Sequence, residues 1–311
     1  MPKMVKPKVP TRKSQNYAPM TCPKRFKGKS RKTFKASQRL NDIMVKLDRK
    51  TTQIFTDMAN YSKSNSYKVP SEVPYGDFFR RLTASRIHCA DSPQEKYVSS
   101  KKTPFKTKSL QTEMNAIKLF CKPSDLLVTG IEFYHPDLFF LSAIPDGVVK
   151  STNSYMIIEV KTIFTVDGAI LNEMGDIFDE TNDIQRWKNQ LSFSLKCCAI
   201  TLGYLLVYDY ETEKLFASFE VNTDIHVNPK ELMKWKELFV REILLRNACF
   251  RGVSDRAKSR FFPRVMSTFN TLLSQHLEAS SFKHSQDLID FSQNRLNQIF
   301  SNEMKTVVLE Y

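Results

Sequence analysis

The sequence has few cysteines, and they do not follow the spacing of a zinc site or a disulfide framework. Six cysteines stand at positions 22, 89, 121, 197, 198 and 249, without a CxxC pair and without a histidine at ligand spacing. Zinc sites and disulfide-rich folds depend on such pairing. We therefore expect neither of them, and we expect a reducing compartment.

Long apolar runs are also missing. No stretch reaches the roughly 20 apolar residues of a transmembrane helix, and the first residues contain no apolar core of a secretory signal. The sequence shows no internal repeat. With 311 residues, 41% of them hydrophobic, the chain can bury one substantial core. These features predict a soluble intracellular protein that does not bind a membrane.

Acidic residues are absent from the first 41 positions, which hold 13 lysines or arginines. The whole chain has a net charge of +14, so the remainder is close to neutral. Five prolines, the last at Pro23, interrupt this segment, and such a proline-rich chain of one charge sign does not pack. We predict a disordered basic tail over residues 1–40. Its densest part contains Lys24, Arg25, Lys27, Lys29, Arg31 and Lys32.

A basic tail of this kind is typical of a nuclear-import signal, of an arm that contacts nucleic-acid phosphates, or of both. A solubilising tail without further function is the open alternative. A mitochondrial presequence needs an amphipathic helix, which the prolines disfavour. We predict a nuclear protein, with cytoplasmic and mitochondrial locations as alternatives.

Hydrophobic periodicity divides the rest of the chain into three parts. Residues 41–74 are predicted to form a helix, which starts near residue 37, and a linker; residues 75–247 form a core, and residues 248–311 a helical extension. Their alternation predicts an α/β fold with a mixed central sheet flanked by helices. In the core we expect helices at 110–120, 184–195 and 229–247, strands at 126–133, 139–149, 155–162, 201–210 and 214–221, and a loop or lid at 167–183.

Two neighbouring predicted strands carry charged residues at their ends. Asp146 precedes Gly147 in the first strand, and Glu159 and Lys161 lie near the end of the second. Residues two apart in a strand project from the same face, so Glu159 and Lys161 share a face and Val160 points away. A carboxylate opposite them on the adjoining strand completes the layout of a divalent-cation site, with a lysine beside the metal-bound water.

Glu113 adds a third acid from a predicted helix. It lies three residues after Leu110 and four before Ile117, and it therefore shares the apolar face of that helix. A carboxylate on such a face is costly to bury unless it has a cation or a hydrogen-bond partner. Pairing with Lys118 is the alternative to a shared metal ion.

Oxygen ligands without sulfur or imidazole favour Mg²⁺, with Mn²⁺ as the alternative. We assign the ligands to Glu113, Asp146, Glu159 and the main-chain carbonyl of Val160. Lys161 would orient the attacking water or help to deprotonate it, so the catalytic set is Asp146, Glu159 and Lys161. Exposed strands also carry Glu and Lys as simple cross-face ion pairs, which is the alternative interpretation.

These motifs resemble those of the PD-(D/E)xK nuclease superfamily and, within it, the lambda-exonuclease or YqaJ-type viral recombinase family, which includes alkaline exonucleases of DNA viruses. The stretch His135–Val149, with its Pro-Asp-Gly, and the strand Ile158–Lys161 are similar to two of that family's motifs. Glu113–Ala116 fits its glutamate-bearing helix, and Arg81–Arg86 resembles its Thr-Ala-Ser element. Gln190 and the strand after it match a glutamine-bearing helix. The resemblance covers residues 75–245.

The resemblance implies a restriction-endonuclease-like fold, a Mg²⁺-dependent reaction on DNA and a ring-shaped homotrimer. Phe78 stands where the family has a phosphate-binding arginine, so Arg80 or Arg81 would substitute, and Gln185 is out of register with a second family glutamine. The residues that the resemblance assigns to the DNA and its 5′-phosphate are Arg80, Arg81, Thr83, Ser85 and Gln190.

We predict a Mg²⁺-dependent exonuclease that degrades linear duplex DNA from 5′ to 3′ in recombination, repair or replication. A structure-specific endonuclease or an RNA nuclease of the same fold is one open alternative. A catalytically inactive nucleic-acid-binding protein is another. The intact acids disfavour this last function, because an uncompensated acid cluster repels a polyanion.

Overall fold

The computed structural model describes residues 31–64, 67–68, 81–84, 109–152, 154–244, 255–280, 282, 284–301 and 307–308. The chain divides into two compact units, residues 1–43 and 44–311. All the packing described below lies within the second unit. None of the described helices is long and apolar enough to cross a membrane.

Helix α1 (Arg31–Ser64) begins earlier than the sequence predicts. Residues 31–40 are helical, which corrects their assignment to the disordered tail, while residues 1–30 lie outside the described part of the chain. No proline follows Pro23 until Pro70, and Lys, Arg, Ala and Gln in between are good helix formers. Beyond residue 44 the helix buries one apolar face, which includes Leu47, Ile54, Phe55 and Met58.

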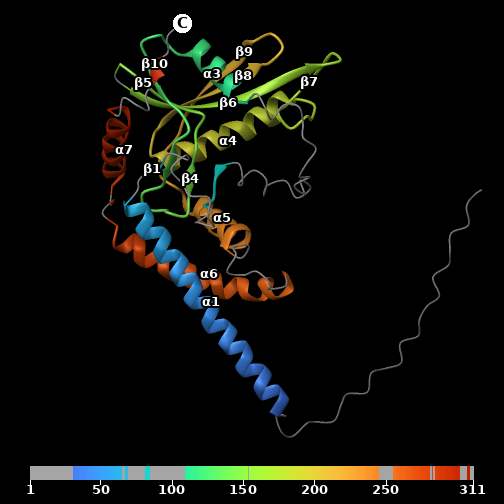
Figure 1. Ribbon diagram of the computed structural model, residues 1–311, viewed down its shortest axis with the longest axis vertical. Coiled ribbons are helices and arrows are strands. Elements are labelled where there is room, and N and C mark those ends of the chain that lie inside the picture. The colour runs from blue at the N-terminus through green and yellow to red at the C-terminus, as the bar shows by residue number, and fades with distance from the viewer. Residues whose placement is uncertain are drawn as a thin grey trace, which may run out of the picture. The chain divides into compact units, whose positions relative to one another are not determined.

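The centre of the fold is a mixed sheet in the order β10-β2-β5-β6-β8-β9, with β7 paired to β6 (Figure 1). β5 pairs antiparallel with β6, and β6 pairs parallel with β8, so the predicted mixed α/β fold is confirmed. The strands are β2 (Leu126–Val128), β5 (Gly147–Ser151), β6 (Ser154–Val166), β7 (Ala169–Leu171), β8 (Leu202–Asp209), β9 (Lys214–Asn222) and β10 (Val307–Val308).

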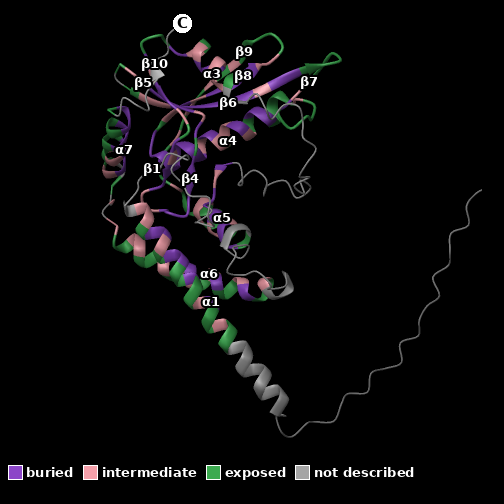
Figure 2. Cartoon of the chain, viewed as in Figure 1, coloured by how far each residue is buried: buried purple, intermediate pink, exposed green. Residues whose placement is uncertain are grey.

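Two helices cover opposite faces of this sheet (Figure 1). On one face, Ile117 of α3 (Ser109–Phe120) packs with Ile158 and Leu206. On the other face, α4 (Glu180–Cys198) packs with the alternate residues of the same strands, among them Leu205. Figure 2 shows the central strands buried between these layers. Strands β6 and β8 carry apolar residues on both faces because both faces are covered, and Glu159 and Lys161 of β6 are buried exceptions.

Two predicted strands are broken in the structure. The stretch 126–133 bends at Gly130 and gives β2 and β3 (Glu132–Tyr134), and the stretch 139–149 gives β4 (Ser142–Ala143) and β5. β3 and β4 join β1 (Tyr67–Lys68) in a separate sheet of order β1-β3-β4. The chain therefore passes from the small sheet into the central one just before Asp146.

The segment 167–183, predicted as a loop or lid, is partly regular. β7 returns along β6 through a two-residue turn, in which Asp167 and Gly168 both have positive φ angles of 51° and 81°. An Asp-Gly pair suits this type of hairpin turn. Only residues 172–179 remain as an irregular loop before α4 begins.

The C-terminal residues are an integral part of the core. The helix predicted over 229–247 is present as α5 (Pro229–Leu238) and the π-helical segment η3 (Phe239–Leu244). Two further helices follow, α6 (Asp255–Glu278) and α7 (Ser285–Phe300). Phe269 of α6 and Leu296 of α7 belong to the same hydrophobic cluster as the sheet. Beyond them, β10 pairs with β2, which the helical prediction for 248–311 does not include.

Phe269→Ala should destabilise the protein by about 3–5 kcal/mol, the range for removing a buried aromatic ring. The Phe269 side chain is 1% exposed, and its ring contacts Phe55, Phe140 and Phe239. Urea unfolding measures the change. Met233→Ala on α5 is the control, because Met233 is 60% exposed and its loss should cost less than about 0.5 kcal/mol. Equal effects of the two changes would contradict the core position of α6.

Candidate active site

The antiparallel pairing of β5 with β6 brings Asp146 next to Glu159 and Lys161. Gly147 lies opposite Ile158, which places Asp146 level with Glu159. One carboxylate oxygen of Asp146, Oδ2, accepts a hydrogen bond of 2.7 Å from the Val160 main-chain N–H. The structure therefore places the two predicted acids beside each other, with Lys161 two residues further along the same strand.

Glu159 and Lys161 are both buried and form an ion pair, with 3.0 Å between Glu159 Oε1 and Lys161 Nζ. Gln190 of α4 donates a hydrogen bond of 2.6 Å from its side-chain amide to the same oxygen. The predicted Gln190 therefore does reach the site. Its partner in the structure is the carboxylate of Glu159, which we assign as a metal ligand.

Lys161 has a second carboxylate partner that the sequence analysis did not identify. Glu173 Oε1 lies 3.6 Å from Lys161 Nζ. Glu173 belongs to the irregular loop after β7, and its only signal in the sequence is the acidic character of residues 167–183. That signal does not distinguish Glu173 from the other acids of the segment.

Two acids of the site, Asp146 and Glu113, have raised pKa values. Burial, and then repulsion by Glu159, raise the pKa of Asp146 well above its usual range, against the attraction of Lys161 and the Val160 hydrogen bond. Burial and the charge of Glu159 also raise the pKa of Glu113. Burial alone would lower the pKa of Lys161, but attraction by Glu159, Glu173 and Asp146 outweighs it and raises that pKa. Lys161 is therefore a firmly protonated ammonium.

The chemistry of these donors fits a divalent cation. Glu113, Asp146 and Glu159 offer hard oxygen atoms, and their mutual repulsion is what a bound cation would relieve. In the described ranges, however, no three His, Cys, Asp or Glu side chains lie close enough to hold a metal ion as they stand. In this arrangement Asp146 and Glu159 bond to protein donors instead.

The predicted phosphate-binding segment is described only in part. Arg80 and Ser85 lie outside the described residues, as do the tail residues Lys24, Arg25, Lys27 and Lys29; Arg31 and Lys32 are described only as helix backbone. Thr83 is half-buried. Leu82 exchanges main-chain hydrogen bonds with Phe140 and Ser142, so this segment lies along the chain that leads to Asp146.

Arg81 is buried and engaged by the protein itself. Its guanidinium donates to the Phe139 carbonyl at 2.8 Å and to the Ser62 hydroxyl at 3.1 Å, and it lies 4.0 Å from the centre of the Tyr134 ring. Burial lowers its pKa, but Tyr134 and Glu132 oppose this effect. These contacts join α1 to the small sheet, so in this structure Arg81 has a structural role.

The raised pKa of Asp146 makes a stability prediction. Below about pH 4 the Asp146 carboxyl is neutral in both the folded and the unfolded protein. As the pH rises, the carboxyl ionises in the unfolded protein first, which favours unfolding and lowers the stability of the folded state. Asp146→Asn keeps an oxygen for the Val160 N–H and removes the charge. In EDTA it should therefore be more stable than the wild type at pH 7, as measured by urea unfolding.

This advantage should disappear near pH 4. Glu237→Gln on α5 is the control, since it removes an exposed acid and changes the net charge equally. An Asp146→Asn protein that gains nothing over this control at pH 7 would contradict the electrostatic account of the site.

Comparison with known proteins gives likenesses to solved structures. No protein-family model matches this chain, and no curated protein sequence matches it. The chain is similar to an alkaline exonuclease (LHK-Exo) from Laribacter hongkongensis, with 12% identity and a TM-score of 0.32, over 64% of this chain and 95% of the exonuclease. It is also similar to SSO0001, with 13% identity and a TM-score of 0.33, over 67% of this chain and 96% of that protein. These TM-scores are too low to support a function, so the function proposed below is argued from the residues of the site.

Proposed function

We propose that this protein is a metal-dependent nuclease, and that it degrades linear duplex DNA from the 5′ end. The observation that carries the proposal is the joint burial of Glu159 and Lys161 beside Asp146, at the junction of two strands. Grouped acids of raised pKa next to a buried ammonium are costly for stability, and such groups are characteristic of active sites. Glu113 and Gln190 approach this group from the helices on the two faces of the sheet.

The chain offers a set of ligands for one Mg²⁺ or Mn²⁺ ion. Glu113, Asp146, Glu159 and the carbonyl of Val160 would hold it. When bound, the ion supplies charge neutralisation at the phosphate and a more acidic water. The protein's own hydrogen bonds to Asp146 and Glu159 hold the two acids in place, and this preorganisation reduces the cost of assembling the site.

Lys161 serves the attacking water and the developing negative charge. Hydrolysis adds water to phosphorus and breaks the bond to the leaving sugar oxygen, while negative charge grows on the phosphoryl oxygens. A fixed ammonium is suited to orient the water and to stabilise this charge. Because its carboxylate partners raise its pKa, Lys161 acts here as a cation and hydrogen-bond donor and not as a neutral base.

The preference for a 5′ end rests on the segment around Thr83 and Ser85. Main-chain hydrogen bonds hold Leu82, next to Thr83, beside Phe140 and Ser142, a few residues before Asp146. Since the Arg81 guanidinium is occupied by the Phe139 carbonyl and Ser62, Arg80 is the better arginine for a terminal phosphate. A homo-oligomeric ring would enclose a duplex, and it belongs to the same proposal.

Incubation of purified protein with end-labelled linear and closed circular duplexes, with Mg²⁺ or EDTA, tests the proposal. Linear duplex should be degraded only with Mg²⁺, faster from a 5′-phosphate than from a 5′-hydroxyl, and circles should survive. Nicking of circles would show the endonuclease alternative, and preferential cleavage of RNA would show the RNA nuclease. Absence of cleavage of every substrate would leave a binding protein.

Asp146→Ala, Glu159→Ala and Lys161→Ala should each reduce cleavage at least about 1,000-fold while duplex binding persists, because each removes a group used in the transition state. Lys196→Ala is the matched control: Lys196 is a similarly buried lysine of α4 that pairs with Glu231 at 2.6 Å. It should keep its activity wherever it remains folded. Wild-type cleavage by Glu159→Ala would exclude the assigned site.

We further propose that the basic tail binds phosphates along the DNA and directs the protein to the nucleus. Deleting residues 2–30 leaves the whole of α1 and removes nine lysines or arginines. Binding to duplexes of all sequences should weaken, and log affinity should fall less steeply with log salt, because fewer counterions are released. Catalysis at saturating DNA should stay nearly unchanged.

The location of tagged full-length and shortened proteins provides the second measurement. The full-length protein should lie in the nucleus and the shortened one in the cytoplasm. An unchanged salt slope together with an unchanged location would leave only the solubilising tail, and a mitochondrial full-length protein would show a presequence instead.

A further inference from the structure

We propose that Glu173 is a positioning residue that holds Lys161 in place for the reaction. It is presented by the loop of residues 172–179, which a buried polar network fixes next to the site. This inference rests on the proposed nuclease function, because it assigns a new residue to that site. Glu173 acts through Lys161 and does not itself need to touch the DNA.

The ammonium of Lys161 lies between two carboxylates of unequal character. Glu159 Oε1 is 3.0 Å from Nζ, and its side chain is almost fully buried. Glu173 Oε1 is 3.6 Å from Nζ, and its side chain is 36% exposed, against 9% for Lys161. Glu173 therefore closes the solvent-facing side of a lysine whose other side is fixed in the protein.

The loop is built around Asn172, which is 3% exposed. Its side-chain oxygen accepts hydrogen bonds from the main-chain N–H groups of Met174 and Asp176, at 3.0 and 3.1 Å. Its own N–H donates to the Asp176 carbonyl, and its carbonyl accepts from Gly175 N–H. Four hydrogen bonds, two to the side chain of Asn172 and two to its main chain, thus fold residues 172–176 into a turn. Glu173 is part of that turn.

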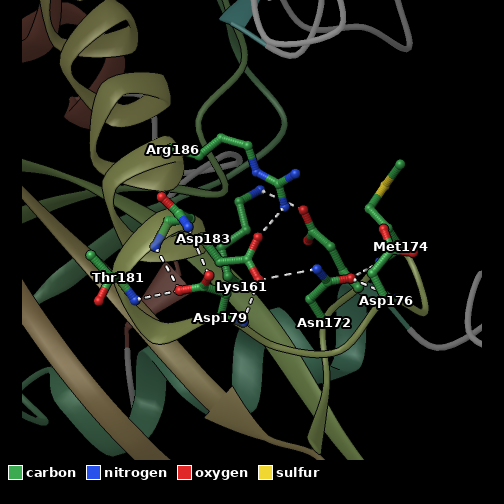
Figure 3. A network of polar contacts seen from close by, with 10 residues as sticks. Lys161, Asn172, Met174, Asp176, Asp179, Thr181, Asp183 and Arg186 are labelled. Atoms are coloured by element: carbon green, nitrogen blue, oxygen red, sulfur yellow. Dashed lines mark hydrogen bonds and ion pairs between the residues drawn. The ribbon is translucent and has the colours of Figure 1, made fainter. Parts of the chain in front are cut away.

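Asp183 ties this turn to helix α4. Its Oδ2 accepts from the Asn172 amide and from the Asp179 main-chain N–H, both at 3.1 Å, and its Oδ1 pairs with Arg186 at 2.8 Å. Figure 3 shows these side chains turned toward one another, with the Met174 side chain pointing away. Phe178 also stacks on the buried Trp187 of α4. Both ends of the loop are therefore anchored.

This anchoring indicates positioning and not a mobile gate. A buried Asn–Asp pair, with a half-buried arginine beside it, is a costly way to hold a surface loop unless the loop carries a group that must stay in place. Glu159 shares its Oε1 between Lys161 and Gln190, and we assign it to the metal as well. Glu173 has no such duties, so it can remain the partner of Lys161 throughout the reaction.

The direct test measures the reactivity of Lys161, without metal or DNA. Purified wild type and Glu173→Gln are treated with a low concentration of acetic anhydride in EDTA, and mass spectrometry gives the acetylation rate of each lysine. The rate at Lys161 should rise severalfold in Glu173→Gln, because the loss of the ion-pair partner on its solvent-facing side leaves the Lys161 amine less shielded and freer to meet the reagent.

The chain contains a matched control. Lys196 and Glu231 have side-chain exposures of 8% and 34%, close to those of Lys161 and Glu173. Glu173→Gln should leave the rate at Lys196 unchanged, and Glu231→Gln should raise the rate at Lys196 without affecting Lys161. An unaltered Lys161 rate in Glu173→Gln would overturn the proposal, whether or not the protein cleaves DNA.

Kinetics on linear duplex with Mg²⁺ then test the role in the reaction. Glu173→Gln should lower kcat about tenfold with little change in KM, because the group that it positions acts in the transition state. Glu173→Asp, which keeps the charge, should recover part of this loss. An unchanged kcat, or a lowered KM that would reveal Glu173 as a competitor of phosphate, would overturn the positioning role.

Asn172→Ala supplies an independent check, because it alters the loop without touching Lys161. It should raise Lys161 acetylation and lower kcat as Glu173→Gln does, and the double variant should be no worse than the single ones. Additive losses would contradict a common route through the loop. If the wild type cleaves nothing, the nuclease proposal fails, and the acetylation rates still decide whether Glu173 holds Lys161.

Discussion

The ammonium of Lys161 is the charge on which this site depends. Burial and neighbouring acids raise the pKa of both Asp146 and Glu113. The positive charge of Lys161 opposes this rise at both residues without cancelling it. A buried lysine in turn needs carboxylates around it, because an unpaired buried charge costs several kcal/mol. Lys161 therefore needs its ion-pair partners Glu159 and Glu173, and its charge in turn reduces the repulsion among the acids. This reciprocity explains why the group is gathered at one point and not spread along the sheet.

The fold meets this requirement by joining elements that are distant in the sequence. The register of β5 with β6 places Asp146 beside Glu159. Helices α3 and α4, on the two faces of the sheet, contribute Glu113 and Gln190. Gly147, next to Asp146, leaves room for the side chains that pack there, since a Cβ would lie 2.9 Å from Leu127 Cδ1 and 3.1 Å from Ile117 Cδ1, and these methyl groups would have to shift. Glycine thus lets α3 approach the strand. The Pro-Asp-Gly sequence therefore contributes an acid and the space beside it in a single turn.

The parts of this arrangement that local patterns encode could be predicted from the sequence. Alternation in β6 placed Glu159 and Lys161 on one face, and the short gap before it indicated the antiparallel partner with Asp146. Glu173 could not be found in this way, because its contact depends on Asn172 and Asp183, which meet only once β7 has turned back along β6. The burial of Arg81 depends similarly on Tyr134 and Ser62, both far from it in the sequence. Pairing of β10 with β2 is nonlocal as well, and two valines do not indicate a strand by themselves.

Lys161 and Lys196, both buried in the described part of the chain, show how a functional ion pair can differ in geometry from a structural one. Lys196 meets Glu231 at 2.6 Å, and Glu231 is also the residue whose side chain completes the capping box of α5. That pair binds α4 to α5 directly. Lys161, of equal burial, divides its charge between Glu159 at 3.0 Å and Glu173 at 3.6 Å. Two carboxylates at these distances attract an ammonium more strongly than a single carboxylate at 2.6 Å, because Coulomb attraction falls only with the inverse of the distance. The division of Lys161 between a fixed acid and a loop acid suits a cation that must stay in place while one of its partners is used elsewhere.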